Sequence, residues 1–434
     1  MSFARKILFA LLLSIFLLPG TSRGIVYIEV DSPQLRLYNL AFPAVRPLGP
    51  PNPKVAKELE EILERDLTIA HLFYLLPRES FPQGGTFVTP WGIDYPAWKE
   101  TGAEFLLSVG YEARGGFLSL RFHLFDCVQG RPIGAKRYRG RLANLRPMVH
   151  RLMDDMLQML TGQRGFFSSK IAFISDSSGL KEIYMVDPDG GKWQPLVKNG
   201  SINISPSWSP DGKRLLFTCF TRRNPDLYEF HLPTGRVRLL SGRPGPNAAA
   251  SYSPDGRRIA LMMRGREGTD IFLMPAKGGP PKRITHSPAS ETSPTWSPDG
   301  RKIAFVSDRT GSPQIYVKDL RTGKSSRITF VGSYNCSPAW SPKGNWIAYS
   351  GRWEGRFRIF LVRPDGSDLR LITQGPGNHE DPSWAPDGRH IVFSSNARGG
   401  YDLYVTTTEG GGPWRITSGK GNETEPAWSP LLGR

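Results

Sequence analysis

The sequence predicts a mostly β protein, a six-bladed β-propeller preceded by a small α/β domain. Gly (47) and Pro (38) make up about a fifth of the 434 residues, which favours tight turns over long helices. An aromatic residue followed by Ser-Pro or Ala-Pro returns every 44 residues through the second half of the chain. The first half instead carries helix and hairpin signals.

Residues 1–24 have the pattern of a secretory signal peptide. A basic pair, Arg5 and Lys6, precedes an apolar stretch over residues 7–18 that is too short to span a bilayer. Small residues then lead to a cleavage site after Gly24. We therefore expect an exported protein that ends as a soluble protein of the cell envelope, with an N-terminal membrane anchor as the alternative.

Residues 25–163 are expected to form the α/β domain. Asn52 followed by Pro53 is typical of an N-cap and a first helical position. The pair Gly115-Gly116 predicts a tight hairpin. The expected strands cover residues 25–30, 39–43, 105–113 and 117–128, and a second helix covers residues 147–160.

Residues 164–434 are built from one repeated unit. In the unit that starts at Trp296, a Ser-Pro-Asp-Gly turn is followed by short apolar strands over residues 303–307, 314–318 and 327–329. A 44-residue unit with about four short strands has the size of a propeller blade. Three columns keep the 44-residue step: Trp208, Tyr252, Trp296, Trp340, Trp384 and Trp428; Tyr184, Tyr228, Phe272, Tyr316, Phe360 and Tyr404; Leu196, Leu240, Ile284, Ile328, Ile372 and Ile416.

The two ends of this region complete each other. The chain ends just after Trp428-Ser429-Pro430, the opening of a unit whose body is missing, whereas the first unit has a strand at Ile171 but lacks that opening. We therefore expect six blades of 44 residues in a ring that the C-terminus closes beside Ile171. Closure removes a sheet edge that would otherwise invite aggregation.

The charge pattern and the cysteine, histidine and motif content argue against several classes of function. The formal net charge is +17, but the basic residues are mixed with Asp through the repeats and form no long run, so we expect no nucleic-acid partner. Cys127, Cys219 and Cys336 are far apart, and the seven histidines show no metal-ligand spacing. The only Gly-x-Ser-x-Gly match lies in the signal peptide. We expect no catalytic, metal or cofactor-binding residues, although a propeller could assemble an active site across blades.

The positions just before each Pro-x-aromatic step are polar or small and differ from blade to blade. Because they recur at one place in every unit, we expect them on one rim around the central channel, in loops that recognise a partner. Ordinary loop variation is the alternative. The candidate residues are Asn203, Ser205, Asn247, Ala249, Glu291, Thr292, Ser293, Asn335, Ser337, Glu380, Asp381, Thr424 and Glu425.

Taken together, these features resemble the TolB family, the periplasmic component of the Tol-Pal envelope system. The resemblance rests on the export signal, the α/β domain, the repeated segments Trp296–Gly300 and Arg327–Thr329, and the junction over residues 160–173. It implies a non-enzymatic adaptor that supports envelope integrity, protein transport and cell division. It also implies a monomer that reaches membranes only through its partners. An exported propeller hydrolase and a generic envelope scaffold with other partners remain alternatives.

The resemblance also implies two partners. A Pal-like peptidoglycan-associated lipoprotein is expected at the channel mouth, through the rim candidates and especially Asn247, Ala249, Thr292 and Ser293. Three departures from the pattern are Ala250, where the other blades have Pro, Ser293, in a column where Asp381 and Glu425 are acidic, and Pro33 after the N-terminal segment. A TolA-like inner-membrane protein is expected on the N-terminal segment, at Ile25, Val26, Tyr27, Ile28, Glu29, Val30, Asp31 and Ser32.

Overall fold

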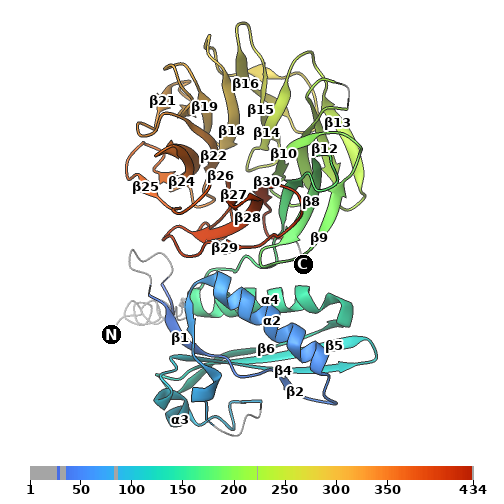
Figure 1. Ribbon diagram of the computed structural model, residues 1–434, viewed down its shortest axis with the longest axis vertical. Coiled ribbons are helices and arrows are strands. Elements are labelled where there is room, and N and C mark those ends of the chain that lie inside the picture. Colours follow the sequence, from blue (N-terminus) through green and yellow to red (C-terminus); the bar gives the residue numbers. More distant parts are fainter. Residues whose placement is uncertain (1–26, 30–35, 83–86, 222, 433–434) are drawn as a thin grey trace, which may run out of the picture.

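The computed structural model describes residues 27–29, 36–82, 87–221 and 223–432. The predicted signal peptide lies outside the described residues. The chain forms two bodies, an α/β domain and a ring of sheets above it (Figure 1). No helix among the described residues is long and apolar enough to cross a membrane.

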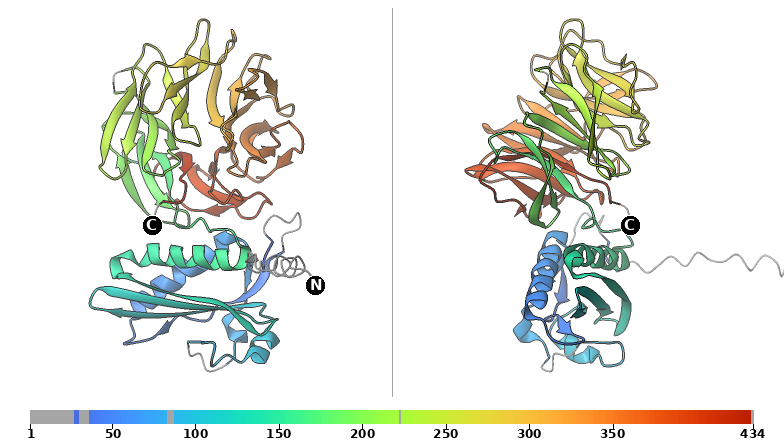
Figure 2. Two further views of the ribbon diagram at one scale, coloured as in Figure 1. Left: turned by 180° about the vertical axis from the view of Figure 1, so that it is seen from behind. Right: turned by 90° about the vertical axis from the view of Figure 1, so that its right-hand side faces the viewer.

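The α/β domain is one mixed sheet with two long helices on one face. The strands run in the order β3-β1-β4-β5-β6, and β2 also pairs with β4. The helices α2 and α4 lie between this sheet and the propeller, so the other sheet face looks away from the ring (Figures 1 and 2). The bounds are β1 Tyr38–Ala41, β2 Arg46–Pro47, α2 Pro53–Ala70, β3 Phe73–Leu75, η1 Arg78–Ser80, α3 Tyr95–Glu100, β4 Phe105–Arg114, β5 Phe117–Asp126, β6 Arg131–Arg141, η2 Leu142–Asn144 and α4 Leu145–Thr161.

Local signals explain where these elements begin and end. The side chain of Asn52 accepts from the backbone N–H of Val55 at 3.3 Å, and Pro53 starts α2. Gly115 and Gly116 both have positive φ (58° and 77°), as a two-residue hairpin of this kind requires. Both helices and this hairpin confirm the prediction. Strand β6 and helix α3 were not predicted from the sequence, because β6 alternates arginines with few apolar residues and α3 is only 6 residues long.

The N-terminal segment differs from the expectation where the structure describes it. Residues 27–29 form no strand. Instead, the backbone N–H groups of Tyr27 and Ile28 both donate to the carbonyl oxygen of Leu160, at 2.9 Å each. The Ile28 side chain is fully buried in the domain core. This part of the segment is therefore docked on the C-terminal end of α4.

The ring is a six-bladed propeller of four-stranded antiparallel sheets, which confirms the fold class. Their strands, from innermost to outermost, have the following bounds. One sheet is β30 Glu423–Trp428, β7 Ile171–Ser175, β8 Glu182–Asp187 and β9 Gly190–Val197; the next is β10 Asn203–Trp208, β11 Arg214–Cys219, β12 Asp226–His231 and β13 Arg236–Ser241. The third is β14 Asn247–Tyr252, β15 Arg258–Arg264, β16 Thr269–Pro275 and β17 Lys282–Arg283; the fourth is β18 Glu291–Trp296, β19 Lys302–Ser307, β20 Gln314–Asp319 and β21 Ser325–Arg327. The last two are β22 Asn335–Trp340, β23 Ile347–Trp353, β24 Arg356–Val362 and β25 Arg370–Leu371, then β26 His379–Trp384, β27 His390–Arg398, β28 Gly400–Thr407 and β29 Trp414–Arg415.

Each blade begins before its repeated aromatic residue, and not at that residue as the sequence repeat suggests. The Ser-Pro-Asp-Gly turn joins the two inner strands of one sheet, so the aromatic residue before it ends the innermost strand and does not begin a blade. In the first blade the innermost strand is β30, from the C-terminus, and it pairs antiparallel with β7 so that Trp428 lies opposite Ile171. The two ends of the propeller region are thereby joined in one sheet.

Three of the repeated tryptophans tie their blade to the preceding one through the indole N–H. The indole N–H of Trp208 donates to the carbonyl of Ala427 at 2.9 Å, and that of Trp384 donates to Ala339 at 2.9 Å. Trp296 makes the equivalent bond to Ser251 at 3.2 Å. Because these bonds reach the preceding blade, the aromatic column packs the ring together and is not a ligand cage.

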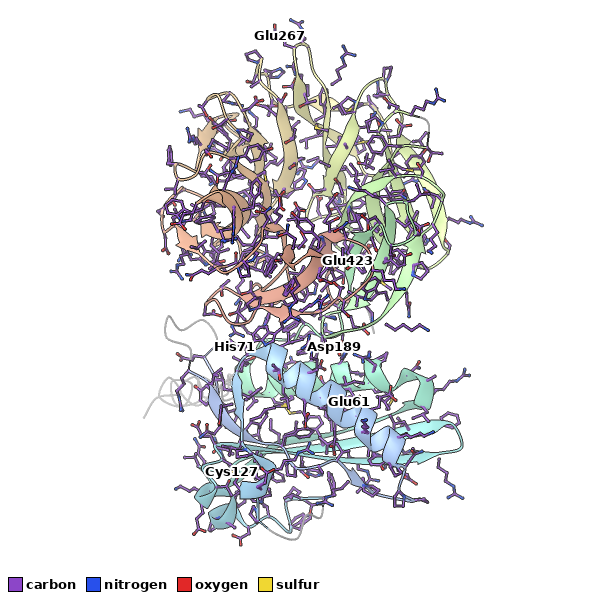
Figure 3. All side chains as sticks on the ribbon, viewed as in Figure 1. Glu61, His71, Cys127, Asp189, Glu267 and Glu423 are labelled. Carbon is purple, nitrogen blue, oxygen red and sulfur yellow. The ribbon has the colours of Figure 1, made fainter. Side chains whose placement is uncertain are left out.

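The two bodies meet where the end of α2 touches the sixth blade. The Arg389 guanidinium donates to the carbonyl oxygens of Ala70 (2.8 Å) and His71 (3.0 Å), and His390 Nε2 lies 2.9 Å from the Ile69 carbonyl oxygen. These carbonyls belong to the last turn of α2, which has no helical partners for them. Figure 3 shows His71 and Asp189 at this boundary.

Candidate functional site

The candidate site is the central channel of the propeller, which is shaped by one bulge in each innermost strand. The pairing register shifts at the same place in all six of these strands, and at that place each has a residue in the left-handed region of backbone space. Only Gly adopts this conformation without cost, so six non-Gly residues here are held by the sheet around them. They are Ser205 (φ 54°), Ala249 (47°), Ser293 (52°), Ser337 (50°), Asp381 (54°) and Glu425 (48°).

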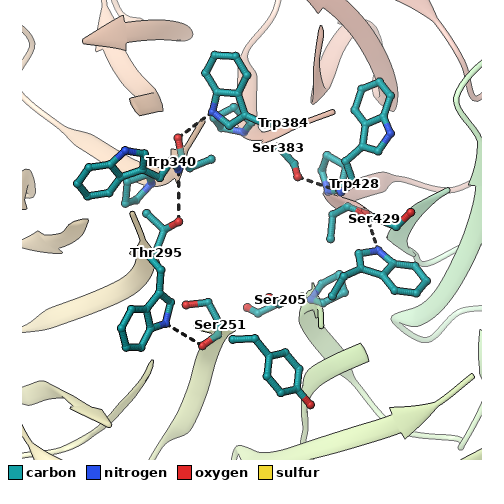
Figure 4. Close-up of a pocket in the computed structure, with 18 of the residues that line it drawn as sticks. Ser205, Ser251, Thr295, Trp340, Ser383, Trp384, Trp428 and Ser429 are labelled. Carbon is teal, nitrogen blue, oxygen red and sulfur yellow. Dashed lines mark hydrogen bonds between the residues drawn. The ribbon is translucent and has the colours of Figure 1, made fainter. Parts of the chain in front are cut away.

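The channel encloses about 520 Å³ and is lined by residues from all six blades. Figure 4 looks into it and shows the ring of aromatic side chains, mostly tryptophans, around it. The six bulge residues line it, together with the prolines that follow five of them. Within the part of the chain that the structure describes, the lining contains no histidine or cysteine that could activate or act as a nucleophile.

Charge is confined to one side of the channel. Asp381 and Glu425 occupy the bulge position in adjacent blades, whereas the other four bulge residues are Ser or Ala. Glu425 accepts from the backbone N–H of Ser205 at 2.6 Å, and Asp381 accepts from the hydroxyl of Ser337 at 2.8 Å. Each carboxylate is thus oriented by a neighbouring blade, Glu425 by the following one and Asp381 by the preceding one, and the pair keeps an acidic surface on the channel wall.

Burial sets the electrostatics of this acid pair. It raises the pKa of Asp381, although the Ser337 hydroxyl and the charge of Lys181 oppose the rise. Burial also raises the pKa of Glu425, and the neighbouring Asp381 charge adds to the effect. Two partly buried carboxylates that disfavour each other's charge are stabilised by a cation placed between them. The channel is therefore suited to a partner that inserts a lysine, an arginine or another cationic group.

In each blade, three consecutive residues precede the Pro-x-aromatic step, and we call them a trio. The structure places the rim candidates differently according to their position in the trio. The last residue of each trio (Ser205, Ala249, Ser293, Ser337, Asp381, Glu425) lines the channel. The middle residues Thr292, Glu380 and Thr424 are half-buried beside it. All of them belong to the innermost strands and not to loops, which corrects the sequence-based expectation. The strand was missed because Ser, Asn and Pro are typical turn residues.

The first residue of each trio is buried and bonds to protein groups around it. Asn203, Asn247, Glu291 and Asn335 are at most 1% exposed. Asn247 donates to the carbonyl of Arg243 at 2.7 Å, Asn335 donates to that of Val331 at 2.9 Å, and Glu291 pairs with Arg309. The three asparagines thus satisfy carbonyls in the loops between blades, and Glu291 balances a charge within its own blade, so these four side chains offer no surface to a partner.

Two residues near the acid pair were not identified from the sequence. The hydroxyl of Tyr401 donates to Glu380, and Lys181 is close enough to influence the pKa of both Asp381 and Glu425. They occupy one column of the 44-residue repeat, in which the other four residues are Pro225, Thr269, Pro313 and Phe357. The variability of this column is the signal that could have revealed them.

Most of the predicted N-terminal partner segment lies outside the described residues. The residues of this segment that the structure does not describe are Ile25, Val26, Val30, Asp31 and Ser32. Tyr27 and Ile28 are docked on α4 as described above, and Glu29 beside them is exposed.

The group that comes nearest to a metal site lies between the two bodies. One ligand atom each of Asp66, His150 and Asp189 lie within 4.8 Å of one another, and all three residues are buried. His150 Nε2 is 3.7 Å from Asp66 Oδ1 and 3.3 Å from Asp189 Oδ1. Arg146 already pairs with Asp189. Since Arg146 balances the charge of Asp189, a proton on His150 suffices to balance the charge of Asp66. The group is therefore best described as an ion network that joins the two bodies.

Comparison with family models matches both parts of the chain. Residues 157–432 match the model described as "TolB beta propeller domain", and residues 26–133 match "TolB amino-terminal domain". Two curated relatives are each named "Tol-Pal system protein TolB". The one from Desulfosudis oleivorans is 36% identical over 219 residues, 50% of each chain. The one from Geobacter sulfurreducens is 39% identical over 214 residues, which is 48% of this chain and 49% of the relative.

The matched region thus spans about half the length of these curated relatives. Among solved structures, TolB from Acinetobacter baumannii superposes with a TM-score of 0.78 at 24% identity, covering 91% of this chain and 97% of that one. At this identity the match establishes the shared fold, which includes both the α/β domain and the six-bladed ring.

Proposed function

Since the chain belongs to the TolB family, we propose that it is a periplasmic, non-enzymatic adaptor of the Tol-Pal system that links a Pal-like lipoprotein to a TolA-like inner-membrane protein. In this role it supports envelope integrity and cell division. The observation that carries the proposal is the channel wall, where Asp381 and Glu425 provide oriented, partly buried charge. The absence of histidine and cysteine from the described channel lining favours binding over hydrolysis.

In this proposal, the Pal-like partner binds at the channel mouth. Its contact set in the proposal is the six bulge residues with the half-buried Thr292, Glu380 and Thr424. A cationic side chain of the partner enters between Asp381 and Glu425. Charge-assisted hydrogen bonds of this kind, shielded from water, are the stronger class of polar contact at an interface.

In this proposal, the TolA-like partner binds the N-terminal segment, residues 25–32. In the described part, Ile28 is fully buried and two backbone N–H groups are bonded to Leu160. To pair with a partner, the segment has to leave this docked state, so docking and partner binding compete. An extended segment that is released in this way can pair with a strand of the partner.

Calorimetric titration with the Pal-like and TolA-like proteins of the same organism tests the proposal. The chain without its signal peptide is expected to bind both. Deletion of residues 25–33 is expected to abolish binding of the TolA-like protein and to preserve binding of the Pal-like protein. If the deletion abolishes neither interaction, the N-terminal segment has no role in partner binding. If the undeleted chain fails to bind either protein, the adaptor proposal is contradicted. Substrate turnover that disappears when a channel residue is replaced would favour the hydrolase alternative.

A further inference from the structure

The sheet face of the α/β domain that looks away from the propeller carries a cluster of arginines. Both long helices cover the opposite face (Figures 1 and 2). On that covered face, Tyr138 donates to Asp155 of α4 at 2.6 Å and Lys136 pairs with the same carboxylate at 2.8 Å. Because side chains alternate along a strand, the neighbours Arg137 and Arg139 point to the face opposite the long helices, where both are exposed.

Strand register collects six arginines on this face. Arg46 of β2 lies beside Gly110, which is opposite Arg121, and Arg121 is opposite Arg137. Arg114, Phe117 and Arg141 form a second row across the hairpin end. We name this surface the arginine face; it consists of Arg46, Arg114, Arg121, Arg137, Arg139 and Arg141, and Glu112 is the one carboxylate at a position of the same face.

These arginines are unpaired, in contrast to arginines elsewhere in the molecule. None of the six makes an ion pair among the residues that the structure describes, and the buried Nε atoms of Arg46 and Arg121 have no hydrogen-bond partner. In the propeller, by comparison, Arg238 pairs with Glu229 and Arg283 pairs with Asp270. Like charges directly opposite each other, such as Arg121 and Arg137, destabilise a sheet. The fold therefore maintains a repulsive arrangement that is offset only in part, by the hydrogen bond from Arg137 to the Ser119 hydroxyl (3.1 Å) and by the charge of Glu112.

The clustering is not a consequence of overall charge. Residues 25–163 contain 16 basic and 15 acidic residues. The arginine face takes six of the basic residues and one acidic residue, which leaves ten basic and fourteen acidic residues for the rest of the domain. Positive charge is concentrated on the sheet face opposite the long helices. Part of this face is covered, since Phe87 packs on His123 and Trp98 clusters with Phe125, but Arg114, Arg137, Arg139 and Arg141 remain exposed. A surface of this kind attracts an extended anionic partner.

We propose that the arginine face docks the protein directly on an anionic phospholipid surface. Guanidinium groups bind phosphate in a bidentate manner, and each basic residue near an anionic leaflet adds to the attraction. Phe117, which is 62% exposed, lies at the hairpin end between Arg114 and Arg141, where it can enter the headgroup region. The face lies at the end of the molecule opposite the ring, so docking leaves the channel free (Figure 1). This contact adds to the proposed attachment through partners.

Vesicle sedimentation tests the proposal with the chain lacking its signal peptide. We expect binding to vesicles of 70% phosphatidylcholine and 30% phosphatidylglycerol, loss of binding in high salt, and little binding to pure phosphatidylcholine. The double variant R137E/R139E, at two exposed positions, should bind on the order of thirtyfold less. The matched control R257E/R301E changes the net charge equally at exposed propeller turns and should bind like the wild type.

A second variant separates charge from insertion. F117S should weaken vesicle binding by a few fold while the salt dependence stays the same, because it removes only the apolar contact. Circular dichroism and binding of the Pal-like protein should be unchanged in both face variants, which shows that they remain folded. Equal vesicle binding by R137E/R139E and by the wild type overturns the proposal. Binding of a polyglutamate peptide without binding of the vesicles also overturns it, in favour of an acidic protein partner.

Discussion

Single residues at equivalent positions of the repeat give the channel its character. Asp381 and Glu425 have the same backbone conformation as Ser293, and the bulge presents all three toward the channel in the same way. The scaffold is therefore constant and the chemistry is set by side-chain identity alone. The same holds at the domain boundary, where His390 reaches the end of α2. The other residues of its column are Lys170, Arg214, Arg258, Lys302 and Trp346.

The bulge conformation predicts how Ser293 responds to substitution. At φ 52°, a β-branched side chain is strained, so Ser293→Val should destabilise the protein by about 1–3 kcal/mol, whereas Ser293→Gly should be neutral or stabilising. Urea denaturation measures the difference. Ser326→Val, on an exposed strand position, is the control and should have little effect. Equal destabilisation by both valine substitutions would show that the bulge is not the cause.

The buried ion network predicts a pH dependence that runs through His150. Burial alone lowers the pKa of this imidazole, but Asp66 and Asp189 outweigh burial and raise it. A raised histidine pKa contributes stability that is fully present below the ordinary value of about 6.5 and is lost as the pH rises through the raised value. We therefore expect a lower free energy of unfolding at pH 8.5 than at pH 6.

Replacement of the histidine provides the check. His150→Gln should reduce this pH dependence when denaturant midpoints are compared at the two pH values. His231→Gln, at a propeller residue that is only partly buried, should leave it in place. A pH dependence that is identical in His150→Gln and in the wild type contradicts the assignment.

At the scale of elements, the end of α2 depends on the propeller. Arg389→Ala removes two donors from the carbonyls of Ala70 and His71, so it should destabilise the docked arrangement by about 1–3 kcal/mol. Differential scanning calorimetry should show the loss. Limited proteolysis should show easier cleavage near the junction over residues 162–169. Arg301→Ala is the matched control, because Arg301 has the same place in the repeat and is exposed.

Elements with a local signal could be predicted from the sequence, and elements that depend on distant contacts could not. The Asn52-Pro53 cap and the Gly115-Gly116 hairpin are encoded within a few residues, and the blades are encoded by their period. Strand β6 has no local apolar pattern and exists because it pairs with β5 along its length. The innermost strands were read as loops because their bulges carry turn residues that only the ring holds in place.

The candidate site was predictable in position and only partly in membership. The 44-residue period placed the variable residues around the channel, where Asp381 and Glu425 indeed lie. It could not show that Asn203 and Asn247 are buried and bond to the loops that precede their strands, because a bulge changes the direction of successive side chains. The contacts between the two bodies, such as His390 with Ile69, join residues 321 positions apart and have no signature within either segment.

At the scale of the whole molecule, stability of the propeller rests on ring closure by β30. A chain that ends after residue 422 lacks this strand and leaves β7 with an unpaired edge. We expect such a chain to aggregate or to form edge-paired oligomers, as measured by light scattering. A chain that ends at Pro430 keeps the strand and should remain monodisperse. Equal behaviour of the two truncations would show that closure is not what stabilises the ring.

The central claim is that the acidic side of the channel is the partner-binding surface. Calorimetric titration of the Pal-like protein of the same organism into the double variant D381N/E425Q tests it most directly. The account predicts an affinity about tenfold or more below that of the wild type, since the partner's cation loses its carboxylates. Glu267→Gln, at an exposed hairpin tip far from the channel (Figure 3), should bind normally. An unchanged affinity of the double variant would contradict the account.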